Sequence, residues 1–261
     1  MGTSQSSKGP MGGVPIIPPW VPDARVSPGS AEPLNIAPLG RFTGARRSLC
    51  SFARSGFPGD MRRGIGRYVH DGYGGAPTAS TRFGSTVSTA AALYAVLSSL
   101  SAGRPPVAGS SLEPTLLAGR PSRQIIDAIV EEVRPSDGTQ DAEASRASLR
   151  EALSEIRLKF KEAQLLRLSP EQRDFVVERF VAMDVYHRFI LDLGKTIQDK
   201  APSAASGLTR LNEVRQYIKE TVSESFQKLR EPGQGLSPAE VKESVRLALL
   251  ETMQAFEAFS E

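Results

Sequence analysis

The chain has 261 residues and a net charge of +3, and its hydrophobic fraction of 39% lies below the usual value of about 45–50%. The single cysteine, Cys50, excludes an intramolecular disulfide and a zinc site built from several thiolates. Residues 1–75 carry nine basic and four acidic side chains, an excess that indicates an acidic partner: nucleic acid, an anionic membrane or an acidic protein groove.

Residues 1–44 are predicted to form an extended, disordered tail, because glycine, proline or serine interrupts nearly every second or third position. Within this tail, residues 14–21 (VPIIPPWV) combine a polyproline-II-prone backbone with apolar side chains. A stiff segment of this kind loses little entropy on docking, so we expect it to bind a partner. The candidate partner-binding residues are Val14, Ile16, Ile17 and Trp20. The alternative is a linker whose apolar residues pack on the protein's own body.

Residues 41–83 interleave arginines with aromatic residues and glycines, and short helices are predicted over residues 45–55 and 60–69. Arginines that track phosphates, with rings that stack on bases, are typical of single-strand nucleic-acid binding; a solvated basic helix surface is the alternative. The candidate arginines are Arg46, Arg47, Arg54, Arg62, Arg63 and Arg67. The triplet Gly64-Ile65-Gly66 lacks a third glycine and a preceding strand, so it is no dinucleotide-binding fingerprint.

From residue 84 onward, apolar residues recur at helical spacing and no alternating run of β-branched residues occurs, which predicts an all-α fold. The stripes predict helices over residues 87–100, 116–133, 149–166, 170–197, 208–229 and 237–259. Ser122 is an expected N-cap, and Ser169-Pro170 is expected to cap and open the following helix. We therefore expect an irregular bundle of five or six helices. The expected division is a tail (1–44), a basic helical segment (45–103) and a helical bundle (104–261).

Neither a secretory signal nor a membrane helix is expected. The first thirty residues have no continuous apolar stretch, and the most apolar window, residues 87–100, is shorter than the roughly 20 residues that span a bilayer. We expect a cytoplasmic protein without a membrane partner.

Groups that could carry catalysis are scarce. His187 lies on the inner face of a predicted helix, where a packing role is expected, and Cys50 is expected to be a small buried residue. His70 stands beside Asp71, but no nucleophile motif or second metal ligand is near it in sequence. The sequence therefore predicts no enzyme, no metal site and no cofactor.

The start of the chain offers a different chemistry. Removal of Met1 would leave the α-amino group of Gly2, an unhindered amine with an ordinary pKa near 7.7–8.0. A serine-rich segment follows it and could enter the pocket of another protein. Gly2 is therefore a candidate modification acceptor. The same residues also match the loose N-myristoylation pattern.

Several stretches carry a resemblance to a known family: MGTSQSSKGPMGGVPIIPPWVPD, RFTGARR, FARSG, GRYVHDGYGG, TRFGS and LAGRPSRQIIDAIVEEVRPSDG. With the helical C-terminal half, they resemble the QatB family of the bacterial Qat anti-phage defence system. The resemblance runs over most of the chain and is strongest in residues 1–135.

The resemblance implies a non-catalytic protein encoded with an ATPase, a QueC-like enzyme (QatC) and a TatD-like nuclease. QueC enzymes use ATP to activate the carboxylate of 7-carboxy-7-deazaguanine for attack by an amine. By analogy, QatC would bind the tail and join the deazaguanine to Gly2 through an amide. The alternative function is a nucleic-acid-binding adaptor that uses the arginines of residues 41–83.

Overall fold

The computed structural model describes residues 15–17, 36–106, 110, 112–229, 235–237 and 239–261. Within these ranges the chain is all-α, as predicted, apart from one isolated antiparallel bridge between Pro15 and Ile36. Most of the predicted tail lies outside the described residues. No single helix of the described part is both long and apolar enough to cross a membrane, although the bent pair of helices at 76–82 and 84–101 meets that test jointly.

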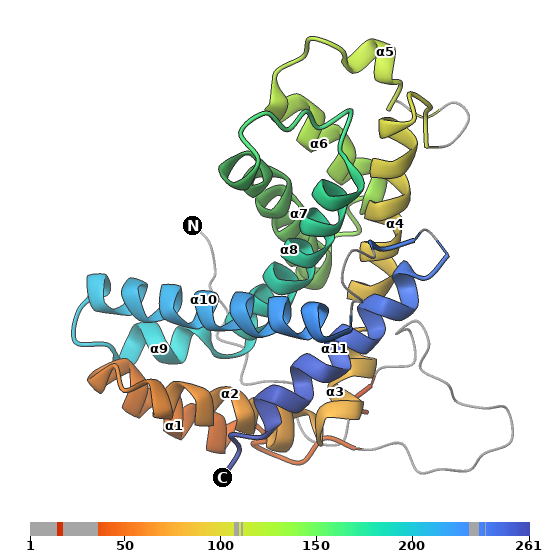
Figure 1. Cartoon of the computed structure of the whole chain (residues 1–261). Helices are drawn as coiled ribbons and strands as arrows, with labels where there is room; N and C mark the ends of the chain where they lie inside the picture. The colour runs from red at the N-terminus through yellow and green to blue at the C-terminus, as the bar shows by residue number, and fades with distance from the viewer. Residues whose placement is uncertain (1–14, 18–35, 107–109, 111, 230–234, 238) are drawn as a thin grey trace, which may run out of the picture. The chain divides into compact units, whose positions relative to one another are not determined.

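The chain forms two compact units, each assembled from separated segments (Figure 1). Unit 1 comprises Met1–Ser85, Arg188–Thr221 and Leu249–Glu261, and unit 2 comprises Thr86–His187 and Val222–Ala248. The boundaries between the two units fall inside helices. The predicted division at residues 44 and 103 was based on composition instead of on contacts, so it stays a prediction.

The N-terminal helices of unit 1 follow from local signals. They are α1 (Thr43–Ser55), α2 (Pro58–Tyr73) and α3 (Ala76–Arg82). Helix α2 begins with Pro58, whose fixed φ suits the first helical turn, and ends at Gly74, whose φ of 75° is the left-handed cap that glycine adopts without strain. Gly64 lets α1 and α2 approach closely, because a Cβ there would lie 2.7 Å from Leu49.

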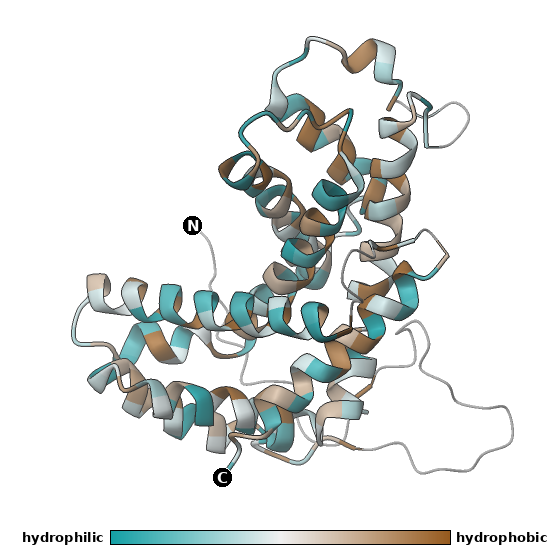
Figure 2. Cartoon of the chain, viewed as in Figure 1, coloured by the Kyte–Doolittle hydropathy of each residue, from teal (hydrophilic) through white to brown (hydrophobic). Residues whose placement is uncertain are grey.

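Among the described residues from 84 onward there are six long helical segments, which confirms the expected five or six helices. They are α4 (Gly84–Ser101), α6 (Ser122–Val133), α7 (Gln140–Lys159), a continuous segment from Pro170 to Lys200, α10 (Ala204–Leu229) and α11 (Val241–Glu257). Helix α5 (Pro114–Leu117) adds one turn. Their hydrophilic and hydrophobic residues are visible along the ribbons in Figure 2.

The segment from Pro170 to Lys200 contains a change of helix type. It consists of α8 (Pro170–Phe189), a π-helical turn η1 (Ile190–Gly194) and α9 (Lys195–Lys200). The start of α8 confirms the Ser169-Pro170 signal, since the Ser169 hydroxyl accepts a bond from the Gln172 amide and the Gln172 side chain accepts one from the Ser169 amide.

Two predicted helices were too long. The stripe over residues 149–166 ends as a helix at Lys159, because Phe160 adopts an extended conformation; Ala163 and Leu165 are nevertheless buried. The stripe over residues 116–133 is broken at Gly119, which has φ 78°. Ser122 is the first residue of α6 and not its cap; Pro121 holds the cap position and no side chain caps the helix.

Candidate functional site

The structure places only part of the expected N-terminal binding segment. Gly2, Val14 and Trp20 lie outside the described residues. Ile16 is buried, with 7% exposure, and its Cδ1 lies 3.7 Å from where a Cβ of Gly74 would be. The chain is therefore anchored on unit 1, at the turn between α2 and α3, by the side chain of Ile16.

A residue near the C-terminal end of the chain, Glu257, stabilises the turn that Ile16 contacts. The Glu257 carboxylate accepts a hydrogen bond from the Ala76 amide at 2.9 Å and contacts Nδ1 of His70 at 2.8 Å. The bond to Glu257 raises the pKa of His70 above its usual value near 6.5. Glu257 thus links α2 to α3 across the turn at Gly74 and Gly75.

Two apolar side chains are exposed where the chain pairs with Pro15, the residue before Ile16. Ile36, which pairs with Pro15, is 61% exposed and Leu39 is 85% exposed, whereas Ala37 between them is buried. Exposed aliphatic side chains beside a buried anchor are suited to contact another protein.

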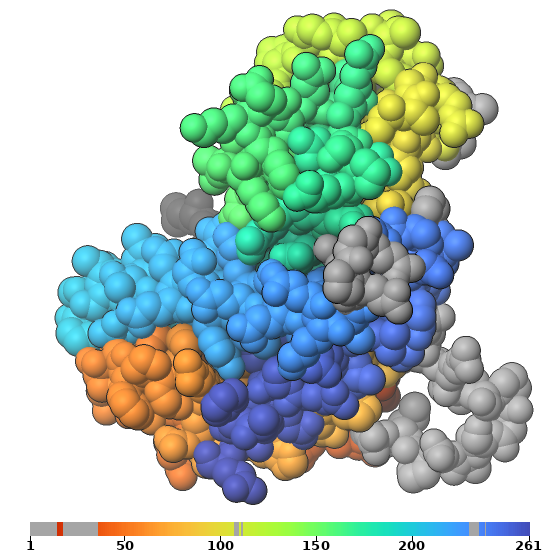
Figure 3. All heavy atoms as spheres, viewed as in Figure 1, coloured from red at the N-terminus to blue at the C-terminus, as the bar shows by residue number. Residues whose placement is uncertain are grey.

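Three of the candidate arginines bind the end of the chain. Arg63 Nε donates to the carbonyl of Glu261 at 3.0 Å, Arg67 Nε donates to the carbonyl of Ser260 at 3.1 Å, and the Arg62 guanidinium lies over the Phe259 ring. Figure 3 shows these last residues, in dark blue, against the orange helices of unit 1. Arg62, Arg63 and Arg67 therefore serve packing within unit 1, a role that sequence reasoning missed.

The other three arginines lie on α1, which contains no acidic residue. Arg47 and Arg54 are exposed and seven positions apart, so they project from the same side of the helix about two turns apart. Arg46 is half-buried and engaged in interactions. The sequence grouped six arginines into one basic surface, but their surroundings divide them into two sets.

Unit 1 also contains a buried tyrosine–carboxylate cluster. The hydroxyls of Tyr68 and Tyr73 donate to one oxygen of Asp192 at 2.9 and 3.0 Å and lie 3.2 Å from each other. Burial raises the pKa of both tyrosines well above the usual value, and the Asp192 charge adds to the shift. Burial also raises the pKa of Asp192.

The π-helical turn explains how Asp192 reaches the tyrosines. Such turns shift the register of a helix and are frequent at functional sites. Here the turn brings Asp192 to the Tyr68 and Tyr73 hydroxyls, while the Arg41 guanidinium lies 5.2 Å from the Tyr73 ring. Because both hydroxyl protons are directed at the carboxylate, the cluster contains no free nucleophile and acts as a polar core.

A serine, a histidine and a glutamate meet in unit 2, although no local sequence pattern indicates this group. Ser148 Oγ lies 2.8 Å from Nδ1 of His187, and Nε2 of His187 lies 3.3 Å from Glu151. The array does not suit nucleophilic catalysis. Ser148 is fully buried, so its hydroxyl is not accessible to a substrate, and the same hydroxyl also bonds the carbonyl of Ala144.

The described residues contain no group of three or more histidine, cysteine, aspartate or glutamate side chains arranged to hold a metal ion. Cys50 is half-buried on α1, rather than fully buried as expected.

Comparison with known proteins gives one match. The family model for the Qat anti-phage system associated protein QatB matches residues 74–256. No curated protein and no solved structure matches the chain. The matched range begins at Gly74, beneath the Ile16 anchor, and includes the later helices that resembled the family only as a helical pattern. The chain belongs to the QatB family of the Qat anti-phage system.

Proposed function

We propose that the chain is a non-catalytic, cytoplasmic component of the Qat system that binds the QueC-like enzyme QatC and presents the Gly2 amine for conjugation. QatC would activate a deazaguanine carboxylate with ATP, and the amine would attack it to form an amide as the activating group leaves. Family membership supports a role alongside other Qat components. The Qat ATPase and the TatD-like nuclease are further candidate partners.

The buried side chain of Ile16 is the observation that carries the proposal. Ile16 attaches the N-terminal segment to unit 1, and only 14 positions separate Ile16 from Gly2. A chain of that length spans at most about 50 Å. The amine can therefore reach into the pocket of a bound enzyme while the rest of the protein stays outside it.

Two sets of side chains remain for contact with QatC. The tail contributes Val14, Ile17 and Trp20, and α1 contributes Arg47 and Arg54. Arg62, Arg63 and Arg67 are less suited to this role, because they already bind the C-terminal residues.

Intact mass tests the proposal. The protein is co-expressed with its operon, and the wild type is compared with Gly2→Val and with the control Ser4→Val, which leaves the terminal amine unchanged. We expect an added mass equal to a deazaguanine acyl group on the wild type and the control but not on Gly2→Val. An unmodified wild type, or an equal adduct on Gly2→Val, would show that the acceptor function is wrong.

The exposed arginines of α1 favour nucleic-acid binding as the second candidate function. If it is correct, an Arg47→Gln/Arg54→Gln variant should lose affinity for a single-stranded oligonucleotide, and wild-type affinity should fall steeply between about 50 and 200 mM salt. Arg246→Gln, which removes an exposed arginine paired with Glu243 on α11, is the control. Salt-independent binding to QatC with no oligonucleotide binding would favour the acceptor function.

A further inference from the structure

Unit 2 contains a cavity beside the start of α6 that is open to solvent. One chamber, of about 490 Å³, is lined by side chains of α6 and α7 and by Leu165 from the connection after α7. A second chamber, of about 410 Å³, shares three lining residues with it: Ser122, Arg157 and Leu165. The volume of each chamber lies within the range of small-molecule sites.

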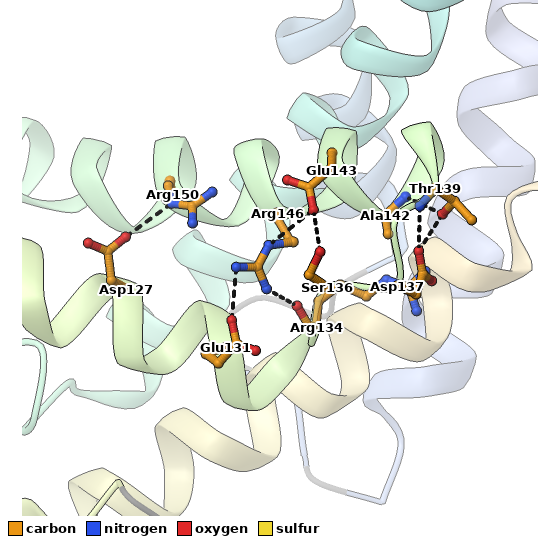
Figure 4. A network of polar contacts seen from close by, with 10 residues as sticks. All are labelled: Asp127, Glu131, Arg134, Ser136, Asp137, Thr139, Ala142, Glu143, Arg146 and Arg150. Atoms are coloured by element: carbon orange, nitrogen blue, oxygen red, sulfur yellow. Dashed lines mark hydrogen bonds and ion pairs between the residues drawn. The ribbon is translucent and has the colours of Figure 1, made fainter.

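The lining is strongly basic. Arg123, Arg150 and Arg157 line the first chamber, Arg167 lines the second, and Asp127 is the one carboxylate among the lining residues. Asp127 is already neutralised, because it pairs with Arg150 Nε at 3.1 Å across the two helices (Figure 4). The side chains of Arg123, Arg157 and Arg167 are exposed to solvent, and within the part of the chain that the structure describes no hydrogen bond or ion pair engages their guanidinium groups.

The backbone adds to the positive potential. Helix α6 begins at Ser122 with neither a side-chain cap nor an acidic residue in its first turn. The amides of Gln124 and Ile125 donate to the Pro121 carbonyl, which leaves those of Ser122 and Arg123 without a partner in the helix, and the helix dipole favours an anion at this end. Because Ser122 lines both chambers, these amides lie beside the shared wall next to Arg157.

Apolar side chains form another part of the lining, alongside the polar Ser154 and Gln164. Ile126, Leu153 and Leu165 form part of the first chamber, and Ile125, Ala163 and Leu166 form part of the second. A free inorganic anion would leave these side chains without a partner. An anionic group attached to an apolar or planar body would use both kinds of surface.

We propose that this cavity binds a small phosphate monoester of about nucleotide size, with its phosphate at Ser122 and Arg157 and its body against Ile126 and Leu153. Arginine and helix amides supply the bidentate and charge-assisted hydrogen bonds that phosphate oxygens accept. The proposal does not depend on the Gly2 acceptor function, since the purified chain alone should bind the ligand.

The α6–α7 pair is rigid enough to hold such a site. Arg146 of α7 donates to the carbonyl of Arg134 at 2.6 Å and to Glu131 at 2.9 Å, and so ties the end of α6 to α7 (Figure 4). The Thr139 hydroxyl caps α7 through the Ala142 amide. Arg123, Arg150 and Arg157 are therefore carried by two helices that are tied to each other.

Calorimetric titration of the full chain with AMP, inorganic phosphate and adenosine tests the proposal. We expect saturable binding of AMP, weaker binding of phosphate and no binding of adenosine. Arg157→Gln should weaken AMP binding at least about ten-fold, the loss expected for a hydrogen bond to a charged group. Arg104→Gln removes the same charge from an exposed position of unit 2 outside both chambers, and it should bind AMP normally.

Ile126→Ser separates the two halves of the site, because it should weaken AMP binding and leave phosphate binding unchanged. Circular dichroism would show that each variant remains folded. The proposal is overturned if AMP does not bind at millimolar concentration, if Arg157→Gln binds AMP as well as the wild type does, or if Arg104→Gln loses as much affinity as Arg157→Gln.

Discussion

The guanidinium of Arg67 donates a hydrogen bond to the backbone carbonyl of Ser260, 193 positions further along the chain. The neighbouring Gly66 allows this contact, because a Cβ there would lie 2.7 Å from the Ser260 amide nitrogen and 2.8 Å from the Phe256 carbonyl oxygen. The end of α11 therefore lies directly on the backbone of α2. The family match ends at residue 256, next to this contact.

Gly66→Ala should destabilise unit 1. The atoms that the new methyl group would meet belong to backbone, which cannot move aside as a side chain can, so we expect a loss of about 1–3 kcal/mol in the free energy of unfolding. Gly207→Ala on α10 is the matched control. Its Cβ would lie 3.5 Å from the nearest atom, an ordinary contact, so helix propensity should stabilise the protein by up to about 1 kcal/mol. Urea unfolding measures both; equal effects would contradict this account of Gly66.

The same contact shows which parts of the structure the sequence could predict. The start of α8 was predictable, because Ser169, Pro170 and Gln172 act on each other within one turn. The roles of Gly66 and Arg67 were not, because their partners lie almost two hundred positions away and the local pattern is that of a basic helix.

The predicted end of α7 was wrong for a related reason. Phe160, Ala163 and Leu166 continue the helical apolar spacing of the residues before them, yet the helix ends at Lys159. Residues such as Ala163 are buried by tertiary packing of a connection, and burial alone produces the same pattern as a helix face. The cavity beside α6 could not be predicted at all, because its lining combines α6, α7 and that connection.

The His70–Glu257 pair should be visible in a proton NMR titration, since the chain has only two histidines. Glu257→Gln should lower the pKa of His70, because the bond to that carboxylate is the largest cause of its rise. Asp71→Asn, which removes the smallest of the contributions, should lower it less. A His70 pKa that is unchanged in Glu257→Gln would contradict the contact.

The sign of the accompanying change in stability follows from linkage. The folded state binds more protons than the unfolded state between about pH 6.5 and the raised pKa of His70. The stabilisation is therefore fully present below about pH 6.5 and is lost as pH rises through the raised value. His70→Gln should remove this part of the pH dependence.

Tyr68 and Tyr73 should ionise well above pH 10 in a spectrophotometric titration. Their folded pKa values are raised above the unfolded value near 10, so their contribution to stability is present below about pH 10 and is lost as pH rises beyond it. Asp192→Asn should lower both pKa values without returning them to 10, because burial is the larger cause. Asp199→Asn, at an exposed site on α9, should change neither; ionisation of Tyr68 and Tyr73 near pH 10 would contradict the buried cluster.

Arg146 and Arg150 provide a matched pair on α7. The Arg146 side chain is 10% exposed and hydrogen-bonds a backbone carbonyl, so Arg146→Gln should cost about 2–3 kcal/mol of unfolding free energy. Arg150 and Asp127 are 41% and 50% exposed, so Arg150→Gln should cost less than about 1 kcal/mol. Chemical denaturation of the two variants measures the difference, and equal costs would show that Arg146 does not hold the end of α6.

The anchor at Ile16 leads to a prediction that separates two roles of the N-terminal segment. Ile16→Ala should release the segment from unit 1, because it removes apolar area buried over the α2–α3 turn. Hydrogen exchange at the Ala37 amide should then accelerate, since Ala37 follows Ile36, which is paired with Pro15. Ile36→Ala alters a side chain that is 61% exposed, and it should leave the Ile16 contact intact.

Affinity for QatC then decides which surface each residue serves. A buried tryptophan anchor carries at least about 2 kcal/mol at an interface, so Trp20→Ala should weaken the complex about thirty-fold. If Ile16 packs on unit 1 in the complex as it does here, Ile16→Ala should leave affinity nearly unchanged and slow the conjugation of Gly2, because the amine loses its fixed origin. A loss of affinity as large as that of Trp20→Ala would mean that Ile16 leaves unit 1 and docks on the enzyme, as the sequence alone predicted. Unchanged affinity and an unchanged conjugation rate would show that the anchor has no part in presenting the amine.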